Sequence, residues 1–201
     1  MSTASLDQGK HILTIISQQG VTEEGISAMT DTGLLSDLCE AADGLRNVDR
    51  DEFRKLLGLS PKTLRITVDY SLSLEQMIAA GKYDWSNSDI TAKRFPLKGS
   101  GKSELEPKLF YFGQDMSSEK VIAEMDKEGF RPCTIEELLA IGEQHPELQR
   151  KFPMVALGSV AELDGDRSVA YLGRNDSKRK LRLHWFGPGW PDIYRFPAVR
   201  K

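Results

Sequence analysis

The order of hydrophobic patterns in the second half of the chain constrains its fold more than any other feature. A strand pattern covers 109–112. Two amphipathic helix patterns follow, at 117–127 and in a segment from Thr134. Four further strand patterns lie at 154–160, 168–172, 180–186 and 194–199. Gly, Asp and Pro residues typical of turns separate the last four. This order predicts an α+β domain with a mixed or antiparallel sheet over residues 105–201.

Residues with capping preferences mark the ends of both predicted helices. Ser117 and Ser118 precede the first helix, and Gly129 follows it. Thr134 precedes the second, and Glu137 stands three residues later, which is the spacing of a capping box. We therefore expect helices that begin after Ser117 and Thr134.

The first 60 residues predict a small, acidic, all-helical unit. Their apolar residues recur at helical spacing, and five basic residues stand against ten acidic ones. Thr22 before two glutamates predicts a helix start, and Asp49 and Gly58 are expected to mark the start and the end of a helix that contains Phe53. A net charge of −5 argues against contact with DNA phosphates by this unit.

Residues 61–104 predict a strand at 64–70, a short helix at 73–80 that ends at Gly81, and an irregular, exposed connection over 82–104. The run Lys98-Gly-Ser-Gly-Lys-Ser103 imitates the end of a phosphate-binding loop. Pro96 stands where such a loop needs its first glycine, and no helix pattern follows. A flexible basic loop is the interpretation that we favour.

Composition excludes several classes of protein. With 39% hydrophobic and 28% charged residues and no apolar run of about 20 residues, the chain predicts a cytoplasmic globular protein without a membrane helix. Cys39 and Cys133 are far apart and predict reduced thiols. His11, His145 and His184 lie on separate elements, so we expect no metal site and no cofactor.

Positive charge is concentrated at the C-terminus. Between Arg167 and Lys201, nine Lys or Arg residues stand against two Asp residues, whereas the whole chain has a net charge of −3. Six aromatic residues are interspersed among these cations. Such a segment predicts a surface for an anionic partner, unless the acidic part of the chain neutralises it.

The element order of residues 105–201 resembles the C-type lectin-like fold and its bacterial relatives. Val155-Ala156-Leu157-Gly158 stands where that fold has a Trp-Ile-Gly-Leu strand, and Trp190-Pro191-Asp192 where it has Trp-Asn-Asp. The resemblance implies that the last strand, 194–200, returns to pair with the first. Over its whole length the chain is also similar to a set of bacterial proteins that share 66–70 and 155–159, a likeness that implies no activity.

Departures from this family favour a binding scaffold over an enzyme. The bridging cysteines of the lectins and their Glu-Pro-Asn or Gln-Pro-Asp ligand tripeptide are missing, so calcium-dependent sugar binding is not expected. The related formylglycine-generating enzymes use cysteines late in the domain, where this chain has none after Cys133.

These observations predict a non-enzymatic module that recognises a ligand or a protein partner. The turn Gly187-Pro188-Gly189 offers little side-chain cover, so we expect Trp190 to be exposed. The residues that we expect to bind are Arg182, His184, Trp185, Trp190, Asp192 and Tyr194. Strand aromatics are ordinarily core residues, and that interpretation stays open.

Two alternatives use the same segment differently. Lys178, Arg179 and Lys180 at a hairpin, with aromatic residues beyond them, fit a nucleic-acid surface. His184 with Asp192 fits a hydrolase in which a carboxylate orients a histidine base. Oligomeric state and the identity of the partner do not follow from these patterns.

Overall fold

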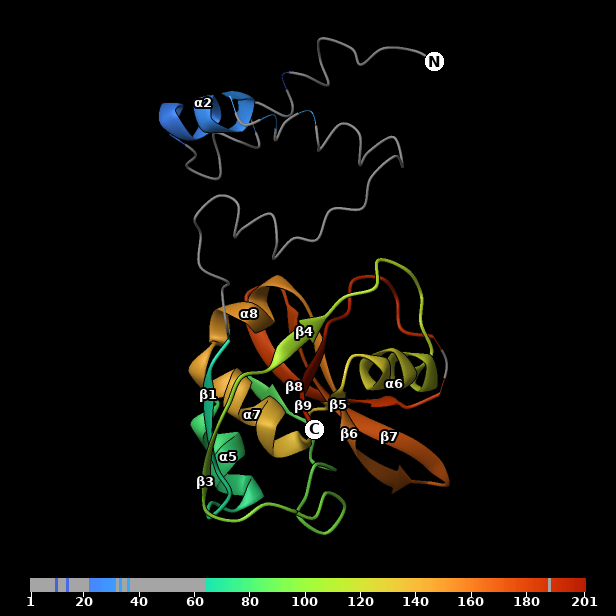
Figure 1. Ribbon diagram of the computed structural model, residues 1–201. Helices are drawn as coiled ribbons and strands as arrows, with labels where there is room; N and C mark the ends of the chain where they lie inside the picture. Colours follow the sequence, from blue (N-terminus) through green and yellow to red (C-terminus); the bar gives the residue numbers. More distant parts are fainter. Residues whose placement is uncertain are drawn as a thin grey trace. The chain divides into compact units, whose positions relative to one another are not determined.

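The structure is a computed structural model, and it divides into two compact units, Met1–Lys62 and Thr63–Lys201 (Figure 1). The residues that it describes are Lys10, Thr14, 22–31, Gly33, Ser36, 64–187 and 189–201. In the first unit, helix α2 (Glu23–Asp31) follows Thr22, whose Oγ1 accepts a hydrogen bond from Gly25 N at 3.2 Å. This predicted start is confirmed. The predicted helix between Asp49 and Gly58 lies outside the described residues.

The second unit is a mixed α+β structure of helices and three sheets. Its helices are α5 (Leu74–Ala80), α6 (Ser118–Lys127), α7 (Ile135–Gln144) and α8 (Pro146–Lys151). Its strands are β1 (Ile66–Asp69), β2 (Trp85–Ser86), β3 (Lys102–Leu105), β4 (Lys108–Phe110), β5 (Phe130–Pro132), β6 (Met154–Leu163), β7 (Asp166–Asn175), β8 (Lys178–Trp185) and β9 (Phe196–Arg200). The sheets have the orders β1-β3, β2-β8-β7-β6 and β4-β9-β5, and β2 and β8 pair in parallel.

The four-stranded sheet buries both of its faces. Successive strand residues point to opposite sides, so Met154 and Ala156 join one core while Val155 and Leu157 join the other. The first core includes apolar residues of β1, α5 and α7, and the second includes residues of α6 and β9. Figure 1 shows α7 beside β1, and α6 near β5. This two-sided burial explains why β6 begins as a continuous apolar run.

The capping residues set the helix starts as expected. Ser117 Oγ accepts a hydrogen bond from Lys120 N at 3.3 Å at the start of α6. At the start of α7, Glu137 Oε2 accepts one from Thr134 N at 2.8 Å. Because helix ends leave backbone groups without helical partners, these side chains fix where each helix begins. Both predicted starts are confirmed.

The last strand closes the domain. β9 lies between β4 and β5, with Lys108 opposite Ala198 and Phe110 opposite Phe196 in the antiparallel pair with β4. The predicted return of the chain to its first aromatic strand is confirmed. The linker before β9, rather than β9 itself, contains Tyr194.

The segment 82–104 is only in part the irregular, exposed connection that the sequence predicts. It contains β2 and the start of β3, which pairs antiparallel with β1. Between these strands, Ile90 is 5% exposed and Phe95 is 1% exposed, and both belong to the first core. Isolated apolar anchors of this kind have no periodicity, so sequence patterns do not reveal their burial.

The glycine-rich run in this segment serves packing. A Cβ at Gly99 would lie 2.0 Å from Cδ1 of Tyr70, so only glycine lets the chain pass the tyrosine ring. Lys102 opens β3, and its Nζ lies 3.1 Å from Asp69 Oδ2 on the neighbouring strand. The run is therefore a strand entry, and the prediction of a flexible loop is wrong for Lys102 and Ser103.

The end of α7 covers the outer edge of β1. The Gln144 side chain accepts a hydrogen bond from Thr67 N at 2.9 Å and donates one to Thr67 O at 2.7 Å. His145 Nε2 lies 2.7 Å from Arg65 O on the same edge. The side chain of Gln144 thus takes the place that another strand would occupy.

A buried arginine joins β8 to the ends of three helices. Arg179 is 5% exposed; its Nε donates to Gln149 Oε1 at 3.0 Å, its Nη1 to Gly81 O at 2.8 Å and its Nη2 to Gly142 O. Burial lowers the pKa of Arg179 from its ordinary value. We call Arg179, Gln149, Gly81, Gly142 and the adjoining Tyr83 the Arg179 cluster.

Tyr83 fits this cluster because two of its neighbours are glycines. The Arg179 Cζ lies 5.0 Å from the centre of the tyrosine ring. A Cβ at Gly142 would lie 2.2 Å from Tyr83 Oη, and one at Gly81 would lie 2.4 Å from its Cε2. The Tyr83 hydroxyl is buried without a hydrogen-bond partner, and burial raises its pKa.

We expect Tyr83→Phe to stabilise the protein by about 1 kcal/mol near pH 7, because it removes an unsatisfied buried hydroxyl. Above pH 10 an unfolded tyrosine loses its proton while the raised pKa keeps the folded one protonated, so wild-type stability falls with rising pH. The variant should lose less stability between pH 10 and 11. Urea unfolding at several pH values measures both effects. If Tyr83→Phe is less stable than the wild type at pH 7, the Tyr83 hydroxyl must have a hydrogen-bond partner.

Candidate functional site

Trp190 is a core residue, so its predicted exposure is wrong. It is 1% exposed, and its Nε1 donates to Ser118 Oγ at 2.8 Å at the start of α6. Its backbone exchanges two hydrogen bonds with Met116, at 2.7 and 3.1 Å. The indole has a polar partner beneath it and aromatic neighbours around it, so the glycine-rich turn directs it inward.

The predicted cationic hairpin has a buried centre. Lys178 is exposed and Lys180 is half-buried, but Arg179 between them points into the Arg179 cluster. The expectation that this hairpin offers three cations to a nucleic acid is therefore wrong for Arg179. In a strand, the middle of three residues points to the opposite face, and here that face lies under α8.

His184 and Asp192 do not form a base and its orienting carboxylate. His184 Nδ1 lies 3.0 Å from Trp185 O, and its ring centroid is 4.8 Å from that of Trp190. Within residues 64–187 and 189–201, no hydrogen bond or ion pair joins His184 to Asp192, which is exposed. The neighbouring Trp185 is 62% exposed and borders a different hollow, together with His184.

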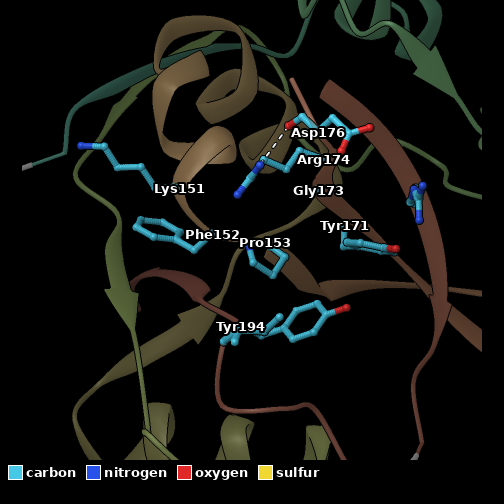
Figure 2. Close-up of a pocket in the computed structure, with 10 residues that line it drawn as sticks. Lys151, Phe152, Pro153, Tyr171, Gly173, Arg174, Asp176 and Tyr194 are labelled. Atoms are coloured by element: carbon cyan, nitrogen blue, oxygen red, sulfur yellow. Dashed lines mark hydrogen bonds between the residues drawn. The ribbon is translucent and has the colours of Figure 1, made fainter. Parts of the chain in front are cut away.

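Two of the predicted residues, Arg182 and Tyr194, meet at one pocket (Figure 2). Its volume is about 470 Å³. The complete lining is Lys151, Phe152, Pro153, Tyr171, Gly173, Arg174, Asp176, Arg182, Ile193 and Tyr194. We call this the cationic pocket, because three of these residues are Lys or Arg and one is acidic.

Strand register and two linkers build the cationic pocket. Tyr171 of β7 stands opposite Arg182 of β8, so the two side chains share one face of the sheet. The linker between α8 and β6 adds Phe152, and the linker before β9 adds Tyr194. The ring centroids of Tyr171 and Tyr194 are 6.0 Å apart. Figure 2 shows the hydroxyls of these two tyrosines pointing to the same side.

The cations of the pocket lack carboxylate partners. Arg174 Nη1 donates to the Asp176 carbonyl oxygen at 2.9 Å, and Arg182 Nη2 donates to Asn175 Oδ1 at 3.1 Å. In the described part of the chain, no carboxylate lies within 4.0 Å of the charged nitrogens of Lys151, Arg174 or Arg182. Their charge is therefore available to a ligand.

One of the residues that line the pocket has a side-chain nitrogen without a partner. Arg182 Nε is buried and makes no hydrogen bond. A buried N–H of a charged group without an acceptor is costly, and an anion is the acceptor that best offsets this cost. Burial, aided by Tyr171, raises the pKa of Tyr194, while Arg182 opposes this effect. The neutral Tyr194 hydroxyl can donate a hydrogen bond.

Sequence reasoning missed most of the cationic pocket. Lys151 ends α8 and Phe152 follows it, and no helix was predicted between the segment from Thr134 and the strand at 154–160. Nothing in the sequence separates the exposed Arg174 from the buried Arg179. Tyr171 and Arg182 come together through the register of β7 and β8, which the sequence patterns do not reveal.

Other candidate chemistry is absent from the described residues. They contain no group of three or more His, Cys, Asp or Glu side chains arranged to hold a metal ion. Cys133 is buried, and burial raises its pKa well above the ordinary value, so it is a poor nucleophile. Among the helices that the structure describes, none has the length and apolar character needed to cross a bilayer.

Comparisons with protein-family models, with curated proteins and with solved structures find no match for this chain.

Proposed function

We propose that this protein is a non-enzymatic recognition module that binds an anionic ligand in the cationic pocket. The observation that carries the proposal is a pocket whose three cations have no carboxylate partner, one of which, Arg182, also has a buried Nε without a hydrogen-bond partner. An acceptor atom from a ligand would complete the hydrogen bonding of this guanidinium.

The size and lining of the pocket support a small ligand. A volume of about 470 Å³ lies within the range of small-molecule sites, roughly 300–1,000 Å³. Phe152, Tyr171 and Tyr194 supply apolar walls, while the cations supply orientation and charge. Such a combination of aromatic walls and few polar groups is typical of ligand sites.

We expect Arg182→Gln to weaken binding of phenyl phosphate at least about tenfold, because the variant loses a charge and the unpartnered donor. Titration of the full-length protein, followed by amide resonances of β7 and β8, gives the affinity and the location. Lys178→Gln is the matched control: it removes the same charge from the same hairpin but lies outside the pocket lining.

Two results would contradict this function. One is equal loss of affinity in Arg182→Gln and Lys178→Gln, which indicates a diffuse charge effect. The other is the absence of binding by phenyl phosphate, methyl phosphate and benzoate in the wild-type protein. A circular dichroism spectrum of each variant confirms that it is folded.

A further inference from the structure

Resting on the proposed function, the geometry points to a more specific ligand class: we infer that the pocket recognises an aryl phosphate, an aromatic ring that carries a phosphate monoester. The phosphate would meet the arginines, and the ring would lie against the aromatic walls. Charge and shape support the two parts of this inference separately.

The charge of the pocket fits a dianion better than a monoanion. Lys151, Arg174 and Arg182 oppose one carboxylate, that of Asp176. A carboxylate ligand would bring one negative charge, whereas a phosphate monoester brings about 1.5 to 2 near pH 7 and three strong acceptor oxygens. Arg182 Nε has no acceptor, and Arg174 donates a hydrogen bond to Asp176 O from a guanidinium that has five N–H groups.

The shape of the pocket fits a planar ring. In Figure 2, Arg174 lies on one side and Tyr194 on the opposite side, with Phe152 at one end, Tyr171 at the other and Pro153 between them. Aromatic rings stack on other rings. A ring against Phe152 and Tyr194 would therefore gain contacts that a small aliphatic phosphate cannot make.

The test compares three probes that differ by one feature each. We expect phenyl phosphate to bind at least about tenfold more tightly than methyl phosphate, which lacks the ring, and than benzoate, which lacks the second charge. Phe152→Leu should reduce the advantage over methyl phosphate and leave that over benzoate. Arg174→Gln should reduce the advantage of phenyl phosphate over benzoate and leave its advantage over methyl phosphate. If a phosphotyrosine peptide binds more tightly than phenyl phosphate, the aryl phosphate belongs to a protein partner. If the peptide binds more weakly, the aryl phosphate is a free small ligand.

The outcomes separate this inference from the proposed function. If methyl phosphate or benzoate binds to the wild type as tightly as phenyl phosphate does, the inferred ligand class is wrong. The proposed recognition of an anion is then still supported. If none of the probes binds, both fail. If Phe152→Leu unfolds, Tyr194→Leu tests the ring contact from the opposite wall.

Discussion

Arg179→Met is expected to lower the free energy of unfolding by about 4 kcal/mol. The change leaves the Gln149 side-chain oxygen and the carbonyls of Gly81 and Gly142 without the donor that they share. Each buried acceptor that loses its partner costs about 1–3 kcal/mol. Methionine keeps most of the aliphatic volume, so the loss reports hydrogen bonding more than a cavity.

Urea unfolding followed by tryptophan fluorescence measures this change in the second unit, because Trp85, Trp185 and Trp190 all lie there. Lys178→Met, one residue away and exposed, is the control and should shift stability by less than about 0.5 kcal/mol. Equal urea midpoints for Arg179→Met and Lys178→Met would show that the hydrogen bonds of Arg179 do not stabilise the second unit. The expected instability also means that a loss of nucleic-acid binding in Arg179→Glu would reflect unfolding.

Trp190→Ala is expected to cost about 4 kcal/mol. A fully buried tryptophan replaced by alanine loses its apolar burial and leaves a cavity, which together cost about 3–5 kcal/mol. The Ser118 hydroxyl loses the indole donor, although it keeps its own hydrogen bond to Phe186 O. The start of α6 and the loop before β9 should loosen together.

The matched control for this prediction is Trp185→Ala. Trp185 is 62% exposed, so its replacement should change the unfolding free energy by less than about 0.5 kcal/mol. Circular dichroism follows unfolding in both variants without relying on the removed indoles. If Trp190→Ala does not fold, Trp190→Phe provides a milder test and should still cost about 2 kcal/mol. Similar stability of the Trp185 and Trp190 variants would contradict the buried position of Trp190.

Local signals in the sequence predicted where α6 and α7 of the second unit begin. Ser117, Thr134 and Glu137 act through hydrogen bonds to residues three positions away, so their effect is visible in a short stretch of sequence. The closing strand β9 was also predicted, while its return to the first strand was what the resemblance to the C-type lectin-like fold implied. The helix starts and the strand depend on neighbours along the chain or on a simple alternation of apolar residues.

Long-range contacts decided the features that the sequence did not predict. Arg179 stands between two lysines, yet its partners are 30 to 98 residues away. The partner of the Trp190 indole, Ser118, is 72 residues away. A charged residue in a hairpin and a tryptophan after glycines resemble surface residues until those partners are known. For the same reason, only two of the six expected binding residues line the cationic pocket.

The Gln144 side chain has a consequence for how copies of this protein behave in concentrated solution. An uncovered strand edge offers its N–H and C=O groups to any passing chain and can seed intermolecular sheets. On β1 both groups of Thr67 are already engaged by the amide of Gln144. The Gln144 side chain thus occupies this strand edge and opposes its pairing with a strand of another copy.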